Sequence, residues 1–189
     1  MAATLSDPGD PALAGATIEG FDSATPGVAS VLSLADVTVS VEGTGSFTVS
    51  EDAGAAVFAP PVSTGEGFLF SSNRTVVFTF DAAVSAFGFV LGVTNFAQPL
   101  TAFDSTGPVV ASLITANQVG DGVPGFTEFY GLSSPSANIA SFSLTSVDEG
   151  WVLDDLPYMT AAPLPASPLL LLGAFGGIAG LRRRRGHGT

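Results

Sequence analysis

The groups of this chain that could do chemistry are almost all carboxylates. The sequence has 17 Asp and Glu residues, no cysteine, and one histidine, His187, near its C-terminal end; its five basic residues are all arginines. Mechanisms that use a Ser–His pair, a Cys–His pair or a Schiff-base lysine are therefore excluded or would need an unusual base. Two carboxylates could hydrolyse a glycosidic bond, but no pair stands out by its spacing. We predict a protein that is not an enzyme, and a glycoside-active enzyme is the remaining alternative.

The charge is distributed unevenly along the chain. All 17 carboxylates lie before residue 156, whereas Arg74 is the only basic residue before Arg182. Residues 1–161 should therefore repel nucleic acid and anionic lipid, because both are bound through basic surfaces. The negative charge could attract cations, or it could serve only to keep the domain soluble.

Short stretches of alternating apolar and polar residues recur between residues 16 and 158. The clearest are Val37–Glu42, Ser46–Ser50, Thr75–Phe80, Phe87–Val93 and Ala140–Leu144. Turn residues separate them, and roughly ten such strands predict an all-β fold, an antiparallel β-sandwich like a jelly roll. Residues 15–160 would form this domain. Residues 1–14 lack the basic start and apolar stretch of a secretory signal, and we expect a loose leader or disordered N-terminus there.

The C-terminal segment, residues 161–189, has three parts in a definite order. The first is a proline motif that consists of Pro163, Leu164, Pro165 and Ala166. An uncharged apolar run continues to Leu181, and as a helix it would be about 27 Å long, just short of the ~30 Å hydrocarbon core of a bilayer. The third part is an arginine cluster: Arg182, Arg183, Arg184 and Arg185. We predict a single apolar helix whose arginines stay in the cytoplasm and leave the domain outside.

This tail resembles the PEP-CTERM class of bacterial sorting signals, in the VPLPA-CTERM variant, with Ala162 in the place of the valine. The resemblance implies recognition by an exosortase-type membrane protease, cleavage near the proline motif, and export linked to extracellular polysaccharide. The protein would be held transiently in the inner membrane and would then reach the cell envelope, the cell surface or the extracellular matrix. An anchor that is never cleaved is the alternative, and it too places the domain outside the cell.

The domain itself resembles the jelly-roll ectodomains that commonly precede this tail. The matching stretches, in order, are Ile18–Asp22, Val77–Phe80, Phe87–Phe89, Leu100–Asp104, Phe129–Gly131 and Trp151–Leu156. Such domains are related in architecture to carbohydrate-binding modules, although a fold does not by itself settle a function.

In jelly-roll binding modules a structural calcium ion often joins the first and last strands, and calcium takes six to eight oxygen ligands. The residues of this chain that match that arrangement are Glu19, Asp22, Asp154 and Asp155. Calcium is the cofactor that we consider, and the alternative is that these carboxylates face solvent. Asp121 and Glu128, around a glycine-rich turn, are a weaker pair.

Trp151 is the only tryptophan of the chain. It could stack on a sugar ring, but we favour a place at the edge of the core. The sequence thus predicts an exported, non-catalytic surface or matrix protein. The alternative is a calcium-dependent carbohydrate-binding module, with Trp151 as its glycan contact.

Overall fold

The structure is a computed structural model, and it describes residues 3–50, 68–72, 74–92, 98–114, 127–136, 138–146 and 150–160. The described residues form short strands and one turn of 3-10 helix. In chain order these are β1 (Ala3–Leu5), η1 (Pro11–Leu13), β2 (Thr17–Glu19), β3 (Gly27–Ala29), β4 (Val31–Ser33), β5 (Val37–Val41), β6 (Phe47–Ser50), β7 (Phe68–Ser72), β8 (Thr75–Gly92), β9 (Pro99–Phe103), β10 (Val109–Ile114), β11 (Thr127–Ser133), β12 (Ile139–Thr145), β13 (Gly150–Asp154) and β14 (Leu156–Thr160).

Every strand pairing within these residues is antiparallel. The predicted all-β antiparallel class is therefore confirmed, and the arrangement is consistent with a β-sandwich. In the part of the chain that the structure describes, no helix is long and apolar enough to cross a membrane. The apolar helix predicted within residues 161–189 lies outside the described residues.

Strand β8 belongs to both layers of the fold. Residues 75–80 pair with β5 on one edge and with β12 on the other. Residues 86–92 pair with β11 on one edge and with β13 and β14 on the other. The sequence pattern shows two separate stretches here, Thr75–Phe80 and Phe87–Val93, and residues Asp81 and Ala82 between them are exposed. The backbone instead continues as one strand that passes from the first sheet to the second.

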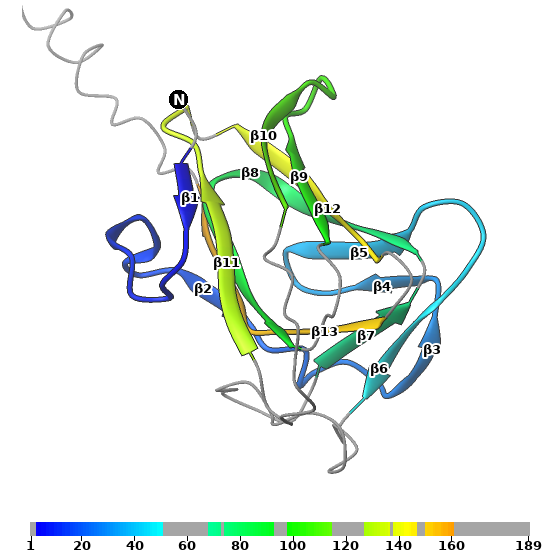
Figure 1. Ribbon diagram of the computed structural model, residues 1–189. Helices are drawn as coiled ribbons and strands as arrows, with labels where there is room; N and C mark the ends of the chain where they lie inside the picture. The colour runs from blue at the N-terminus through cyan, green and yellow to red at the C-terminus, as the bar shows by residue number, and fades with distance from the viewer. Residues whose placement is uncertain are drawn as a thin grey trace, which may run out of the picture.

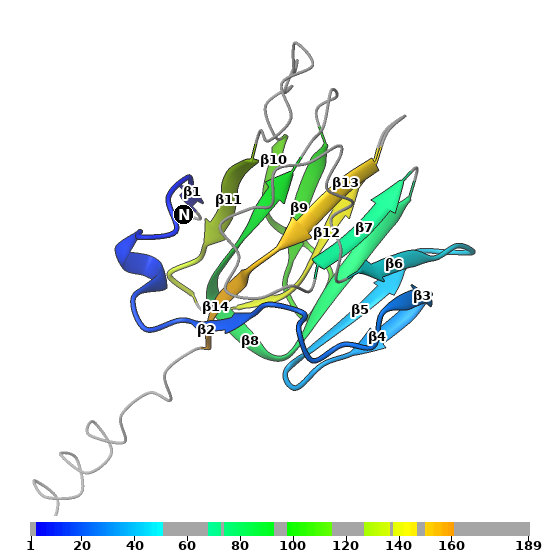
Figure 2. The ribbon, with the colours of Figure 1, turned by 90° about the horizontal axis from the view of Figure 1, so that it is seen from below.

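The first sheet has the order β4-β5-β8-β12-β9-β10. In the second sheet, β11 pairs with β1 on one side and with β8 on the other. The opposite edge of β8 pairs with β13 and with β14. Strand β13 also pairs with β7, and β14 also pairs with β2. Figure 1 shows β1 and β11 at one end of the molecule and β3, β4 and β6 at the other. Figure 2 shows β13 leading into β14, with β2 beside it. The first and last parts of the described domain therefore lie side by side.

A cluster of aromatic side chains fills the space between the two sheets. Phe142 of β12 stacks on Phe78 and on Phe87, with ring centroids 4.4 Å and 4.2 Å apart. Phe89 and Phe80 lie around the same ring, at 5.6 Å and 6.0 Å. All five rings are buried. The phenylalanines that alternate along β8 therefore point into the core, because every second side chain of a strand lies on the same face.

The described N-terminal residues pack on the domain, whereas the sequence pattern predicted a loose leader or disordered N-terminus at residues 1–14. β1 pairs with β11 through Ala3 and Ser133 at one end and Leu5 and Gly131 at the other. Leu5 and Leu13 are only 4% and 5% exposed and pack in one small cluster. A three-residue strand is too short to show an alternation in sequence, which is why the pattern did not reveal it.

Two glycines let β8 and β11 approach closely where Gly88 pairs with Gly131. A Cβ atom on Gly131 would overlap the backbone carbonyl oxygen of Phe87, and one on Gly88 would overlap the ring of Phe129. The ring of Phe129 therefore lies directly over Gly88, on the face of the second sheet that also meets the N-terminal residues.

Candidate functional site

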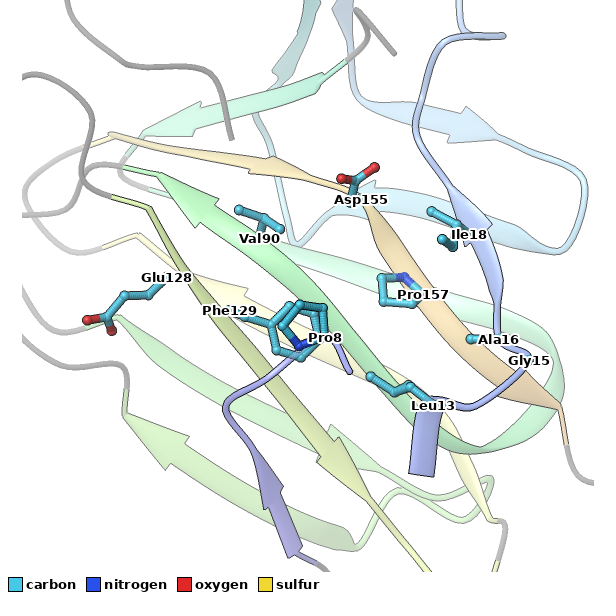
Figure 3. A pocket seen from close by; sticks show the side chains of 10 residues that line it. All are labelled: Pro8, Leu13, Gly15, Ala16, Ile18, Val90, Glu128, Phe129, Asp155 and Pro157. Carbon is cyan, nitrogen blue, oxygen red and sulfur yellow. The ribbon is translucent and has the colours of Figure 1, made fainter. Parts of the chain in front are cut away.

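A cavity of about 520 Å³ opens between the N-terminal segment and the second sheet (Figure 3). We call it the N-terminal groove. Its lining residues are Pro8, Leu13, Gly15, Ala16, Ile18, Val90, Glu128, Phe129, Asp155 and Pro157. They come from the segment before β2 and from β2, β8, β11 and β14, so distant parts of the chain meet here. Most of these side chains are apolar, which is typical of sites for small organic molecules.

One wall of the groove is formed by the turn η1, which a local hydrogen bond stabilises. The side chain of Asp10 accepts a hydrogen bond of 2.8 Å from the N–H of Ala12 and so caps this turn. Pro11 occupies the first position of the turn, where its fixed φ angle fits and its missing N–H costs nothing. The turn places Leu13 against Phe129 and the small cluster around Leu5.

The opposite wall consists of strand residues that point away from the aromatic core. Phe87 and Phe89 of β8 point into the core, so Val90 points to the other face of the sheet. Pro157 of β14 pairs with Ile18 of β2 on that same face. Ile18 is 53% exposed, which is unusual for a large apolar side chain in this domain. The second sheet therefore offers an apolar surface on its outer face.

Asp155 enters the groove at a bulge between β13 and β14. Val90 pairs with Asp154, and Phe87 pairs with Tyr158. Between these two pairs, the segment from β13 to β14 therefore has one residue more than β8. Asp155 takes up the extra residue with a φ of 44°, a left-handed conformation that aspartate and asparagine adopt more readily than most residues. Its N–H donates to Oδ1 of Asp154 at 2.7 Å. The bulge thus brings a carboxylate that is only 8% exposed to the edge of an apolar groove.

Glu128 lies at the other margin of the groove. The hydroxyl of Tyr130 donates a hydrogen bond of 2.5 Å to Oε2 of Glu128. In Figure 3 the carboxylate of Glu128 extends away from the group that Val90, Phe129 and Pro157 form. The carboxylates of Asp155 and Glu128 therefore both lie at the edge of the groove, outside its apolar lining.

The surroundings of β14 are strongly acidic. Tyr158 donates a hydrogen bond of 2.9 Å to Oδ2 of Asp36. Burial is the main cause that raises the pKa of Tyr158 to about 12, and the hydrogen bond to Asp36 and the charges of Asp36, Glu19 and Asp81 add to it. Since Arg74 is the only basic side chain among residues 1–160, ion pairs within the domain can neutralise very few of its 17 carboxylates.

The four residues predicted to bind calcium are only partly brought together. Asp154 and Asp155 form the bulge, and Glu19 pairs with Leu156 directly beside it. Oε1 of Glu19 accepts a hydrogen bond of 3.0 Å from the N–H of Phe21, and Asp22 lies exposed in the turn that follows. Across residues 3–160, as far as the structure describes them, no group of three or more Asp, Glu or His side chains is placed to hold a metal ion. Calcium binding at these residues stays a prediction.

Trp151 is fully buried in β13, as the favoured interpretation as a core residue predicts, and the alternative of a glycan contact finds no exposed ring here. Its ring faces the core between the sheets and offers no surface to a sugar. The indole Nε1 atom has no hydrogen-bond partner among the described residues.

Two groups of predicted residues lie outside the described residues. They are the sorting motif Pro163–Ala166 and the arginine cluster Arg182–Arg185. Asp121, one of the weaker cation candidates, is also outside them.

The fold is similar to that of a known adhesin domain. The K2 cleaved adhesin domain of Lys-gingipain matches with a TM-score of 0.52 and 12% sequence identity, over 78% of this chain and 99% of that chain. At this identity the similarity concerns the fold alone. No protein-family model matches the chain, and no curated protein matches it.

Two larger proteins match less well. The enzymatically active domain of tailspike protein 4 from bacteriophage CBA120 has a TM-score of 0.39 at 18% identity, over 67% of this chain and 19% of that chain. The CBM22-1–GH10 modules of xylanase 10B from Clostridium thermocellum have a TM-score of 0.34 at 13% identity, over 76% of this chain and 27% of that chain. This chain therefore spans only a small part of either protein.

Proposed function

We propose that this chain is an exported bacterial surface or extracellular-matrix protein, with a non-catalytic jelly-roll ectodomain and an exosortase-type sorting signal. The observation that supports this most is the order of proline motif, apolar run and arginine cluster in the sequence after β14, which ends at Thr160. The partners would be an exosortase-type protease, the membrane before cleavage, and extracellular polysaccharide. The similarity to the cleaved adhesin domain concerns the fold, so the surface role depends on the tail.

The charge of the domain fits this role. A domain with 17 carboxylates and one arginine is soluble and repels both nucleic acid and anionic lipid. Only the tail carries the basic residues that would hold a segment on the cytoplasmic side of a membrane. The two parts of the chain thus have the opposite charges that an external domain and a cytoplasmic stop would need.

In a cell that contains an exosortase, the mature protein should end near Pro165 and lack the arginine cluster. The intact mass of protein purified from the envelope measures this directly. Replacing Pro163 and Pro165 with alanine should leave the chain at its full mass, whereas Pro168→Ala, outside the motif, should not. A mass that still includes Arg185 in the unaltered protein would make the tail a permanent anchor. Protein found in the cytoplasm would contradict export altogether.

A calcium-dependent carbohydrate-binding module is the second candidate. It is favoured by the pairing of β2 with β14, which brings Glu19 beside Asp155. If calcium binds only the folded domain, the free energy of unfolding should rise by about 2.7 kcal/mol at a calcium concentration a hundredfold above the Kd. Binding to a glycan array should then disappear in chelator. A melting temperature that is the same in millimolar calcium and in chelator would remove this candidate.

A further inference from the structure

We propose that strand β4 (Val31–Ser33) pairs with the same strand of a second copy of this chain, so that the first sheets of the two copies join edge to edge. Among the described strands, β4 pairs with β5 alone, and no described strand covers its other edge. An exposed edge strand is a template for pairing with another chain. The proposal concerns only the folded domain and does not depend on export.

Hydrogen bonds at both ends of β4 fix the orientation of the backbone in the hairpin of β4 and β5. The N–H of Leu34 donates to the carbonyl oxygen of Val37 at 2.9 Å. The N–H of Val41 donates to the carbonyl oxygen of Ser30 at 3.1 Å. In an antiparallel pair, residues bonded to the partner alternate with residues whose N–H and C=O groups point away from it. The even-numbered residues of 30–34 therefore bond to β5, and the residues between them direct these groups to the outer edge.

Val31 and Ser33 are the residues whose backbone groups face this outer edge. Their spacing is self-complementary, because an antiparallel second copy would place Val31 opposite Ser33 and Ser33 opposite Val31. All the outward N–H and C=O groups of both strands then find partners around a twofold axis at Leu32. Such a pairing uses the same surface on both copies, as the interface of a symmetric dimer does.

The edge is neutral, whereas the domain is strongly acidic. Residues 23–35 contain no charged side chain, although residues 1–160 hold 17 carboxylates and one arginine. The half-buried side chains of β5 on the outer face, Thr38 and Ser40, are neutral as well. Two copies repel each other over most of their surfaces, and β4 offers them a place to approach. A basic partner would gain more from the carboxylates elsewhere, so a second copy suits this edge better.

The side chains of β4 also favour pairing. Val31 is 58% exposed, and Ser33 is exposed on the same face of the strand. Leu32 points the other way and packs against the core, which holds the strand in place. Natural edge strands are often protected by a charged side chain, a proline or a bulge. β4 has none of these, and pairing would cover part of the Val31 side chain.

Sedimentation velocity of the full chain over a range of protein concentrations tests for the dimer. A contact between three-residue strands is small, so we expect a weak dimer whose share grows with protein concentration. Added salt should strengthen the association, because salt screens the repulsion between the two acidic domains.

Two variants with the same change in net charge locate the contact. Val31→Asp should raise the Kd of the dimer at least ~10-fold, because it replaces an apolar contact with two like charges close to the twofold axis. Thr4→Asp makes the same change at an exposed residue of β1, an edge strand at the other end of the molecule (Figure 1). It should change the Kd less than about twofold.

A pair of cysteine variants tests the register of the two strands. The chain has no cysteine of its own, so Val31→Cys and Ser33→Cys each carry a single thiol. In the mixed dimer these residues would face each other with Cα atoms ~5.5 Å apart, within the range of a disulfide bond. Under air oxidation, a mixture of the two variants should give the mixed disulfide at least ~5-fold faster than either variant gives its own. Intact mass distinguishes the products.

A chain that stays monomeric at about 1 mM in high salt would overturn the proposal. Association that Val31→Asp and Thr4→Asp leave equally strong would overturn it as well, because the contact would then lie elsewhere, for example in residues 161–189. So would a mixed disulfide that forms no faster than the other two. None of these measurements depends on cleavage of the tail, so this proposal and the proposed function fail separately.

Discussion

Replacing Phe142 with alanine should lower the free energy of unfolding by about 3–5 kcal/mol. The ring is fully buried and stacks on Phe78 and Phe87, and through these contacts it joins the two sheets. Its removal leaves a cavity between strands that are held by pairings on both sides and so cannot collapse freely. Urea unfolding followed by circular dichroism measures the change.

Two matched variants define what this result means. Phe142→Leu keeps most of the buried volume and should cost less than Phe142→Ala. Val28→Ala, at a residue that is 74% exposed on β3, should change stability by no more than about 0.5 kcal/mol. A loss below about 1 kcal/mol for Phe142→Ala would mean that the aromatic cluster does not hold the sheets together.

Gly131→Ala should be the most damaging single-methyl change in the second sheet. The new Cβ would overlap the carbonyl oxygen of Phe87 and would also approach Cα of Gly88 at 2.9 Å. Both are backbone atoms of β8, so relief requires the two strands to separate. We expect a loss of about 3 kcal/mol or more, above the usual cost of an extra methyl group in a packed site. Thermal and urea unfolding of the variant measure it.

Gly88→Ala provides the comparison, because its new Cβ would overlap a side chain, the ring of Phe129. Removing that ring in the double variant Gly88→Ala, Phe129→Ala should recover part of the stability that Gly88→Ala loses. The same treatment of Gly131→Ala with Leu5→Ala should recover nothing, because the overlap with the backbone persists. If Gly131→Ala is as stable as the unaltered protein, the close approach of β8 and β11 is wrong.

The sequence pattern predicts the core of this domain well. Phe78, Phe80, Phe87 and Phe89 alternate with small or polar residues, and all four are buried, as that alternation predicts. Trp151 also lies in the core, as we favoured. These predictions succeed because the period of a strand is local, and each inward side chain follows from its neighbours in sequence.

The groove could not be predicted in the same way. Its walls come from five separate segments, and Leu13, Ile18 and Phe129 lie in no common pattern. Asp155 reaches it only because β13 and β14 together hold one residue more than β8, a count that depends on how strands from different parts of the chain pair. The continuity of β8 across Asp81 could not be predicted either, because the strands that pair with it there lie far away in sequence.

The place of β8 in both sheets has a consequence for when this domain can fold. During synthesis β8 is complete long before β11, β12, β13 and β14, and β14 is the last strand that the structure describes. Contacts between such distant segments form slowly, because a long stretch of chain must be ordered before any of them is made. A nascent chain that stops short of Leu156 lacks β14, which pairs with residues 84–87 of β8, and β2 has no strand to pair with until β14 is made. The ribosome therefore makes nearly the entire domain before its two sheets can close, and throughout that interval the chain is without its final strand pairings.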